Sequence, residues 1–350
     1  MRVVHVHRIG GIGGSERHLL TLLPALAARG LDVRFVGLDD PRAAPDPFYA
    51  ELTVPFERLT CRWDFDSRLV RRLRRALRGA DLVHTHLVHA DVHGALAARA
   101  PLVSTKHNDD PFRAGAFRHV ERLLTRRFRQ VIAISEALRR FNIQRVGLPA
   151  EKLEVVHYGL DELPRPWGES PELGLPDGAR VLLCVARLAP QKGVDMAVRA
   201  LPVIRAEQPG AVLVVLGEGP ERPRLAGEGV YLPGRVGDVA AWYRRAELVV
   251  HPARWEGFGI ALLEAMLAGK AVVASSVSSA PEIVVDGETG VLVPPDDASA
   301  LATAVNGLLA DPTRAASYGA AGLERARAEF SVARMVERTL EVYERARQVT

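Results

Sequence analysis

The pattern that most constrains this sequence is an alternation of short β-type runs with stretches of helical periodicity. In the first half, the β-type runs are residues 2–7, 32–38, 81–85, 102–105 and 131–134. Amphipathic stretches separate them, such as residues 15–29, where leucines recur at helical spacing. Strands that alternate with helices are typical of a parallel sheet covered on both faces. The sequence therefore predicts an α/β fold of the doubly wound type.

The alternation stops once and then starts again. Residues 163–178 carry four prolines and three glycines, which is typical of a linker. Four further β-type runs follow at residues 181–186, 211–216, 247–251 and 271–274. We therefore expect two Rossmann-like domains, residues 1–163 and 164–330. Their carboxyl strand ends are expected to face a cleft, where ligands bind in such folds.

Composition excludes several classes of protein. The chain of 350 residues is 48% hydrophobic, and its net charge is +4 from 46 basic and 42 acidic residues. This charge is too small to indicate a nucleic-acid partner, and no apolar run is long enough to span a membrane. The two cysteines, Cys61 and Cys184, are far apart in the sequence, which favours a reducing compartment. These features predict a cytoplasmic protein.

A glycine-rich segment follows the first predicted strand. Residues 9–16 read IGGIGGSE, where glycines allow close approach of the backbone and a helix N-terminus offers N–H groups to a phosphate. The dinucleotide fingerprint fails because position 16 is glutamate rather than glycine, which disfavours an NAD-dependent dehydrogenase. Two interpretations remain, a loop that faces a phosphate and a plain tight turn.

Histidines are concentrated in the first domain. Four of them fall within ten residues, at His84, His86, His89 and His93. We do not expect a metal site, because Ala90 breaks the H-E-x-x-H pattern; one or two of the four are expected to line a cleft. His107 is the stronger candidate, since it follows a predicted strand at the carboxyl edge of the sheet; the alternative is a surface histidine.

The second domain carries two cations and two carboxylates with informative spacing. Arg187 follows a strand and Lys192 opens a helix, which suits a diphosphate leaving group. Glu256 and Glu264 are separated by seven residues, and Glu264 lies among apolar neighbours on a predicted helix. A buried carboxylate is costly unless it is hydrogen-bonded, and ribose hydroxyls would supply such bonds.

Taken together, these segments resemble the retaining glycosyltransferases of family 4, which have the GT-B fold. The matching motifs run in the family's order: GGxGGxE at 10–16, DLVHTH at 81–86, STKH at 104–107, AISE at 133–136, VARLAPQKG at 185–193, LGEGP at 216–220, LPGRV at 232–236, HPARWEGFGIALLEAMLAGKAVVAS at 251–275 and APEIVVDGETGVLV at 280–293. One departure is the serine-rich SSVSSAPE before Pro281, where many relatives carry glycines.

The resemblance implies a hexosyltransferase-type reaction. A sugar would move with retention from a UDP or GDP sugar to a hydroxyl acceptor, such as a sugar or a lipid-linked glycan, in glycoconjugate, polysaccharide or glycolipid synthesis. We single out no Asp-x-Asp metal signature in the chain, so we expect cationic side chains in place of a metal, no cofactor, and a front-face route with the diphosphate as base. The last helix, residues 331–350, is expected to cross back to the first domain.

The resemblance also assigns roles to individual residues. The catalytic set is His107, Arg187, Lys192 and Glu256. The substrate-binding set is Gly13, Gly14, Arg235, Val236, Phe258, Gly259, Ile260 and Glu264. In these sets the two cations hold the diphosphate together with the glycine pair, Glu264 takes the ribose, and the pair at 235–236 borders the base. Glu256, the backbone at 258–260 and His107 contact the transferred sugar.

Three other functions compete with transfer. A GT-B sugar-nucleotide 2-epimerase would need a donor but no acceptor. A phosphorylase would carry pyridoxal phosphate on a lysine. A nucleotide-sugar binding protein without activity would show no turnover, although the candidate site residues argue against it.

Arginines are clustered in the first domain. The segment 68–78 reads RLVRRLRRALR, in which arginines share one broad helical face opposite Leu69, Leu73 and Leu77. A second basic segment, residues 118–129, carries five more arginines. Such faces are either simply solvated or suited to anionic lipid headgroups. The second interpretation predicts peripheral contact with an anionic membrane at its inner face.

Overall fold

A computed structural model describes the chain except residues 11–12, 41–46, 62–66, 164–165, 167–173 and 349–350. The chain forms two compact units, and the first combines Met1–Gly159 with Val332–Thr350. The second unit is Leu160–Ser331, so the division after Gly159 lies close to the sequence-predicted boundary at residue 163. The final helix is thus counted with the first unit.

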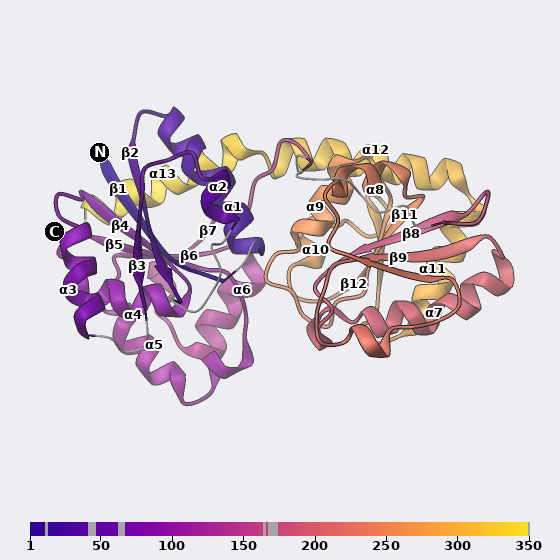
Figure 1. The fold of residues 1–350 in the computed structure, drawn as a ribbon, viewed down its shortest axis with the longest axis horizontal. Coiled ribbons are helices and arrows are strands. Elements are labelled where there is room, and N and C mark those ends of the chain that lie inside the picture. The colour runs from indigo at the N-terminus through magenta and orange to yellow at the C-terminus, as the bar shows by residue number, and fades with distance from the viewer. Residues whose placement is uncertain (11–12, 41–46, 62–66, 164–165, 167–173, 349–350) are drawn as a thin grey trace. The chain divides into compact units, whose positions relative to one another are not determined.

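The first unit is built on a parallel sheet of seven strands in the order β3-β2-β1-β4-β5-β6-β7 (Figure 1). The strands are β1 Arg2–Ile9, β2 Asp32–Asp39, β3 Phe56–Thr60, β4 Leu82–His86, β5 Leu102–Lys106, β6 Gln130–Ala133 and β7 Leu153–Val155. The strand order reverses between β1 and β4. In open parallel sheets, ligands bind at the carboxyl ends of the strands beside such a reversal.

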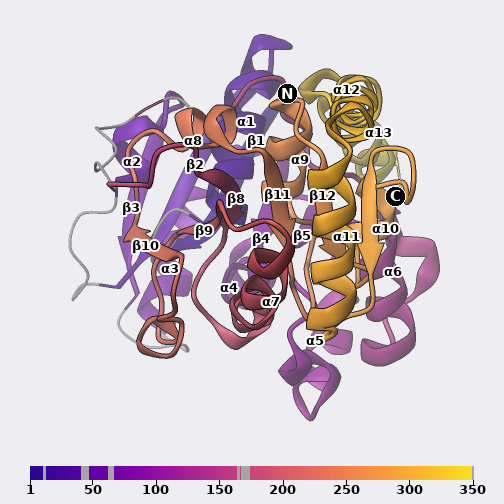
Figure 2. The ribbon, with the colours of Figure 1, turned by 90° about the vertical axis from the view of Figure 1, so that its right-hand side faces the viewer.

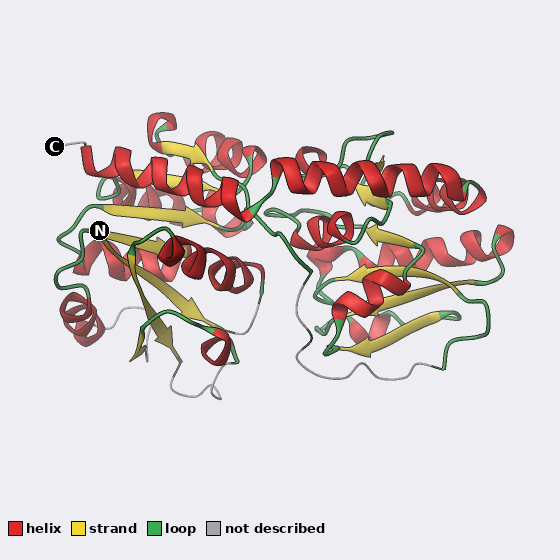
Figure 3. Ribbon diagram, turned by 90° about the horizontal axis from the view of Figure 1, so that it is seen from above, coloured by secondary structure: helices red, strands yellow, loops and turns green. Residues whose placement is uncertain are grey.

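Helices cover both faces of the first sheet (Figure 3). They are α1 Gly14–Ala28, α2 Phe48–Glu51, α3 Ser67–Ala76, α4 Leu87–Ala97, α5 Phe117–Thr125, α6 Glu136–Phe141 and α13 Val332–Gln348, with short turns η1 Pro111–Ala114, η2 Asn142–Val146 and η3 Ala150–Lys152. One apolar cluster joins leucines of α1, Val3 of β1, and Met335 and Tyr343 of α13. The C-terminal helix therefore completes the core of the first unit.

The second unit repeats the plan with six parallel strands in the order β10-β9-β8-β11-β12-β13. The strands are β8 Arg180–Val185, β9 Ala211–Leu216, β10 Val230–Gly234, β11 Leu248–His251, β12 Val272–Ser275 and β13 Gly290–Val293. The helices are α7 Val194–Glu207, α8 Val239–Arg245, α9 Ile260–Leu267, α10 Ala280–Ile283, α11 Ala298–Ala310 and α12 Pro312–Glu329, with turns η4 Pro190–Lys192 and η5 Arg222–Arg224. Helices α7 and α11 lie side by side on one face (Figure 2).

The structure confirms the doubly wound α/β class and adds four strands that we did not anticipate. These are β3, β7, β10 and β13, which are the edge strands of the two sheets. Strand β3 reads FERLT and β10 contains Pro233, so neither has the continuous apolar run of a central parallel strand. Edge strands are half-paired and more polar, which weakens their signal in the sequence.

Candidate functional site

The strand order of the second unit brings the predicted donor residues to one place. Arg187 and Lys192 follow β8, and Glu256 follows β11, the strand that pairs with β8. The order reverses between these two strands. The carboxyl ends of parallel strands share one edge of the sheet. Lys192 and Glu256, which are 64 residues apart in the sequence, therefore meet beside the reversal, where such folds bind ligands.

Lys192, Glu256 and His251 form a buried polar contact in the second unit. The Lys192 ammonium donates to Glu256 Oε2, and His251 Nε2 lies 3.1 Å from the same oxygen. Burial alone would raise the pKa of Glu256, but the neighbouring Lys192 and His251 hold that pKa well below its ordinary value. Glu256 is therefore an ionised carboxylate at neutral pH, and it fixes the position of one cation.

Arg254 holds the turn that carries Lys192. Its guanidinium donates two hydrogen bonds of 2.8 Å to the Asp195 carboxylate and one of 2.8 Å to the Pro190 carbonyl. Gly193 closes the turn with a φ of +59°, and a Cβ there would lie 2.0 Å from the Pro252 carbonyl oxygen. Only glycine permits this close approach. The turn at 190–193 is thus fastened to the segment that precedes Glu256.

Glu264 is placed by the helix that follows the glycine pair. Gly259 starts α9 with a φ of +94°, a left-handed conformation that favours glycine. Glu264 is buried, and its Oε2 accepts a 2.8 Å hydrogen bond from the Tyr243 hydroxyl. We expected ribose hydroxyls to bond this carboxylate; the structure gives it an in-chain partner from α8. Tyr243 was not indicated by any motif in the sequence.

The serine-rich loop that departs from the family's glycines supports the same site. Ser278 has a φ of +46°, and its hydroxyl accepts a 3.2 Å hydrogen bond from the Glu256 amide. The Ser279 hydroxyl donates a 2.7 Å bond to the Phe258 carbonyl. The two serines thus fix the backbone on both sides of Gly257.

The remaining donor-side candidates differ in exposure. Arg187 is exposed, and it donates a 3.1 Å hydrogen bond to the Gln191 side chain. Arg235 is exposed after β10, whereas its neighbour Val236 is buried. Phe258 is buried, Gly259 is the cap of α9, and Ile260 is its first residue. The exposed guanidiniums are free to meet a charged ligand at the surface of this unit.

In the first unit, His107 directly follows β5 and both of its ring nitrogens have partners. Its Nε2 lies 3.0 Å from His86 Nδ1, and its Nδ1 is hydrogen-bonded with the Tyr158 hydroxyl. Burial lowers the pKa of His107 well below its ordinary value, so the ring is neutral at pH 7. A ligand that bonds this ring must replace one of the two partners. His84 and His86 are fully buried, so the expectation that such histidines line a cleft fails for both.

In the glycine segment of the first unit, the carboxylate of Glu16 is hydrogen-bonded to the backbone at the start of the helix. Gly14 begins α1, and the Gly13 amide donates a 3.0 Å hydrogen bond to Glu16 Oε2. The other oxygen of Glu16 lies 3.0 Å from His7 Nε2, while His7 Nδ1 lies 3.1 Å from the His86 carbonyl oxygen. Both ring nitrogens of His7 therefore lie beside oxygen atoms, one of which belongs to Glu16. Residues 11–12 of this segment lie outside the described residues.

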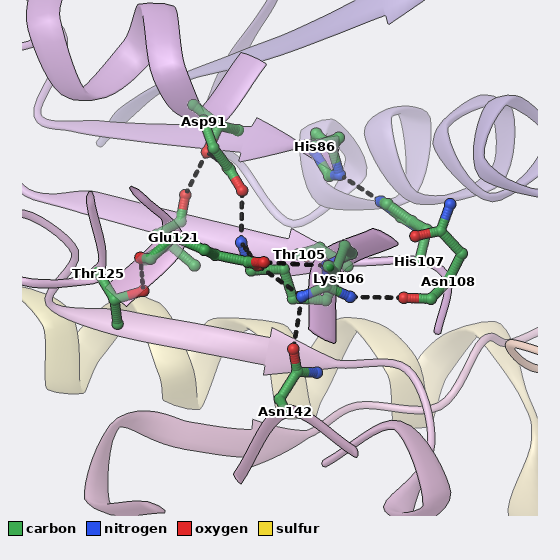
Figure 4. Close-up of polar contacts among 12 residues, drawn as sticks. His86, Asp91, Thr105, Lys106, His107, Asn108, Glu121, Thr125 and Asn142 are labelled. Atoms are coloured by element: carbon green, nitrogen blue, oxygen red, sulfur yellow. Dashed lines mark hydrogen bonds and ion pairs between the residues drawn. The ribbon is translucent and has the colours of Figure 1, made fainter. Parts of the chain in front are cut away.

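A neutral cluster of four buried charges adjoins His107, because Lys106 is one of its members (Figure 4). Lys106 Nζ lies 2.5 Å from Asp91 and 3.0 Å from Glu121, and Arg113 lies 2.5 Å from Glu121. Burial alone would raise the pKa of Glu121, but the two cations lower it to about 2. Arg113 also donates a 2.6 Å bond to the Asn108 carbonyl. The cluster therefore anchors the start of the loop that follows His107.

One group of the described residues has the composition of a metal site. Nitrogen atoms of His5, His84 and His86 lie within 4.8 Å of one another. Each ring nitrogen of these three also lies within hydrogen-bond distance of another described side chain, so an ion would have to replace those bonds. The sequence further contains an Asp-x-Asp pair, Asp64 and Asp66, which we did not single out and which lies outside the described residues.

Two family models match the chain, one for each half. Residues 12–162 match the model described as Glycosyltransferase Family 4, and residues 179–311 match the model described as Glycosyl transferases group 1. The α-maltose-1-phosphate synthase of Mycobacterium tuberculosis is 32% identical, with 95% of each chain covered. The phosphatidyl-myo-inositol mannosyltransferase of Mycobacterium leprae is 30% identical, covering 95% of this chain and 93% of the relative.

Solved structures agree with these matches. HepE of Anabaena, crystallised in complex with UDP and glucose, is 25% identical and superposes with a TM-score of 0.85, covering 98% of this chain and 99% of its own. The two-sheet architecture is thus the GT-B fold.

Within the described part of the chain, we find no helix with the length and apolar character needed to cross a bilayer.

The buried histidines predict that acid destabilises the protein. Burial lowers the pKa of His5 and of His18 to about 3, against an ordinary value of 6.5. Between these values the unfolded state binds protons that the folded state does not, so stability falls as the pH falls through this range. From pH 7 to pH 5, each such histidine should reduce the free energy of unfolding by about 2 kcal/mol.

The variant His18→Phe tests the contribution of one of these histidines to the pH dependence. The His18 ring stacks on Tyr158 with a centroid distance of 4.3 Å, and its buried Nδ1 has no hydrogen-bond partner among the described residues, so phenylalanine preserves the packing. Urea unfolding at pH 7 and pH 5 measures how much the free energy of unfolding decreases between these pH values. In His18→Phe this decrease should be smaller by about 2 kcal/mol than in the unmodified protein. His119→Phe, at an exposed position on α5, is the matched control. An unchanged loss in His18→Phe would contradict the assignment.

Proposed function

The chain belongs to the glycosyltransferases of family 4, and from this premise we propose that it transfers a sugar from a nucleoside-diphosphate sugar to a hydroxyl group with retention of anomeric configuration. The observation that carries the proposal is the contact of Lys192 and His251 with Glu256 beside the strand-order reversal of the second unit. It presents a cation and a carboxylate together at the edge where such folds bind ligands. A diphosphate and a sugar hydroxyl are the groups that suit this pair.

The leaving group is stabilised by side chains in this proposal. Breaking the glycosidic bond puts negative charge on the departing diphosphate, and preorganised cations stabilise that charge most strongly in the transition state. Arg187 supplies an exposed guanidinium whose hydrogen bond goes to the neutral Gln191 amide. Lys192 forms an ion pair with Glu256, and this pair holds the ammonium in place before the donor binds. The departing diphosphate then serves as the base for the acceptor hydroxyl, on the same face of the sugar.

The other site residues receive recognition roles. Glu264, oriented by Tyr243, accepts hydrogen bonds from the ribose. Glu256 and the backbone of Phe258, Gly259 and Ile260 bind hydroxyls of the transferred sugar, and Arg235 with Val236 borders the base. His107 contacts the sugar from the first unit, and Gly13 with Gly14 faces the diphosphate.

The donor is proposed to be of the UDP or GDP type. HepE was crystallised with UDP and glucose, whereas one relative that matches 41% of this chain is named a GDP-mannose-dependent mannosyltransferase of Mycolicibacterium smegmatis. The proposed acceptor is a sugar or lipid-linked glycan hydroxyl. A 2-epimerase is the alternative, and it would act on the donor without an acceptor.

A lipid-linked acceptor would require contact with a membrane surface, and helix α5 has the side chains for it. Glu121 and Thr125 of α5 are buried in polar contacts, whereas Val120 and Leu123 are 42% and 61% exposed. Phe112, in the preceding turn, is 54% exposed. Arginines at 118, 122 and 126 are exposed on the same helix and its end. Helix α3 instead buries Leu69 and Leu73 and offers arginines alone, so we place the anionic-membrane contact on α5.

Turnover assays test the reaction itself. The protein should consume one UDP or GDP sugar only in the presence of acceptor, and NMR of the product should show the anomeric configuration of the donor. A chelator should leave the rate within about twofold, because cations replace a metal, and Lys192→Ala should lower turnover by roughly 100-fold. An inverted product, or loss of activity that added Mg²⁺ restores, would refute these points. A 2-epimer formed without acceptor would support the alternative.

Two glutamine variants separate the roles of the carboxylates. Glu264→Gln should weaken binding of the nucleoside diphosphate by roughly tenfold, because a charged hydrogen-bond acceptor to the ribose is lost. Glu256→Gln should leave that affinity nearly unchanged and lower transfer, because its partner is the sugar. Calorimetric titration with the nucleotide alone, followed by transfer assays, measures both. Equal losses of nucleotide affinity would contradict the division of roles.

Vesicle sedimentation tests the membrane contact. The protein should bind anionic vesicles at low salt, and replacing the three α5 arginines with glutamine should weaken binding by roughly 100-fold, at roughly 1 kcal/mol per arginine. The matched variant, Arg71, Arg72 and Arg75 to glutamine on α3, should have a smaller effect. Leu123→Ser should weaken binding even at high salt. Absence of binding to anionic vesicles at low salt would favour a soluble acceptor.

A further inference from the structure

Seven side chains in the core of the first unit are joined by six consecutive hydrogen bonds. In order they are Thr105, His84, Tyr343, His5, His86, His107 and Tyr158, and we refer to them as the histidine network. The first five contacts measure 2.7, 2.7, 3.3, 3.0 and 3.0 Å, and the sixth joins His107 Nδ1 to the Tyr158 hydroxyl. The network runs from the middle of the sheet, through helix α13, to the carboxyl edge.

The histidines of this network are neutral. No member is more than 8% exposed, and His5, His84, His86 and Tyr343 are completely buried. Burial lowers the pKa of His5 to about 3 and lowers those of the other three histidines well below the ordinary value. A neutral imidazole has one nitrogen that donates and one that accepts, and each hydroxyl has one proton to donate.

These conditions leave two arrangements of protons. If Thr105 donates to His84 Nε2, every later contact must point the same way, and all four histidines carry their proton on Nδ1. If Tyr158 donates to His107 Nδ1, every contact reverses and all four carry their proton on Nε2. Any mixture places two acceptors face to face or leaves a buried N–H or O–H without an acceptor, which is costly.

His107 is the member that a substrate could contact. Its Nε2 points toward His86, which is completely buried, so Nδ1 is the nitrogen on the side of Tyr158. The proton on this ring decides whether Nδ1 donates to a sugar hydroxyl or accepts from one. Tyr343 is the only residue of the network that the chain adds after residue 158, and it joins His84 to His5.

We infer that Tyr343 of helix α13 is a positioning residue for the reaction, because through the histidine network it fixes which ring nitrogen of His107 carries the proton. The inference rests on the proposed function for its effect on transfer, since it assumes that His107 meets the sugar. Its effect on the histidines themselves does not depend on that function.

Nitrogen-15 NMR of the full-length protein, labelled on histidine, tests the network directly. Long-range proton–nitrogen spectra distinguish a protonated ring nitrogen from a bare one. At pH 7 the four histidines should all show the same tautomer. In Tyr343→Phe, the ring that packs on His84 and His5 is kept but the hydroxyl is lost. The network is then cut between His84 and His5, and His107 should lose its single tautomer.

Two further variants control this result. Tyr49→Phe removes a partly buried hydroxyl contact in the first unit, to Asp39, but lies outside the network, so the four tautomers should not change. Thr105→Val removes the hydroxyl at one end of the network and should change the tautomer of His84. This variant tests the network even if Tyr343→Phe fails to fold. Mixed tautomers in the unmodified protein, or a His107 tautomer that is unchanged in Tyr343→Phe, would overturn the inference.

Transfer assays complete the test. Tyr343→Phe should lower kcat by roughly tenfold while the affinity for nucleoside diphosphate stays within about twofold, because the second unit binds the nucleotide. Tyr49→Phe should leave kcat unchanged. If no donor supports transfer but the tautomers respond as stated, the proposed function fails and the network stands. If transfer occurs but kcat in Tyr343→Phe is normal, the role of Tyr343 in the reaction is refuted.

Discussion

The parallel order of the strands is the constraint on which the candidate site residues of each unit depend. When all strands of a sheet run the same way, every loop at their carboxyl ends emerges at one edge. His107 follows β5, Lys192 follows β8 and Glu256 follows β11. Within the second unit, Lys192 and Glu256 therefore meet although they are distant in the sequence. The strand order reverses between β1 and β4 in one sheet and between β8 and β11 in the other, and ligands bind beside such a reversal in folds of this class.

Two groups of buried polar side chains in the first unit are compensated locally, and in two different ways. The cluster of Lys106, Asp91, Glu121 and Arg113 pairs two positive with two negative charges, so it anchors the loop after β5 without a net buried charge. The histidine network contains no charge at all and depends on a consistent direction of hydrogen bonds. The first solution tolerates small displacements, because charges attract over distance. The second requires every donor to meet an acceptor, which makes it specific but vulnerable to the loss of one hydroxyl.

Much of the architecture could be predicted from the sequence, because central strands and glycine-rich turns leave strong local signals. The apolar run of β9 and the spacing of Glu256 and Glu264 are examples. Edge strands such as β3 were missed because half-paired strands are more polar. The partners of the site residues were also missed, because no local pattern marks them. Tyr343 contacts His84 across 259 residues, and Tyr243 contacts Glu264 across 21, so only the fold shows that these side chains meet.

The C-terminal helix changes how the two halves can be separated. Because α13 supplies Tyr343 and Met335 to the core of the first unit, that unit is discontinuous in the sequence and encloses Leu160–Ser331 as an insertion. A fragment that stops at residue 159 would lack part of its own core. An exchange of the second unit with that of a relative would therefore replace an interior segment bounded by two junctions. A graft that runs through to the C-terminus would instead bring a foreign helix into the core of the first unit. The interior segment Leu160–Ser331 can thus be exchanged as one unit, whereas the segments before and after it belong to a single core and have to be kept together.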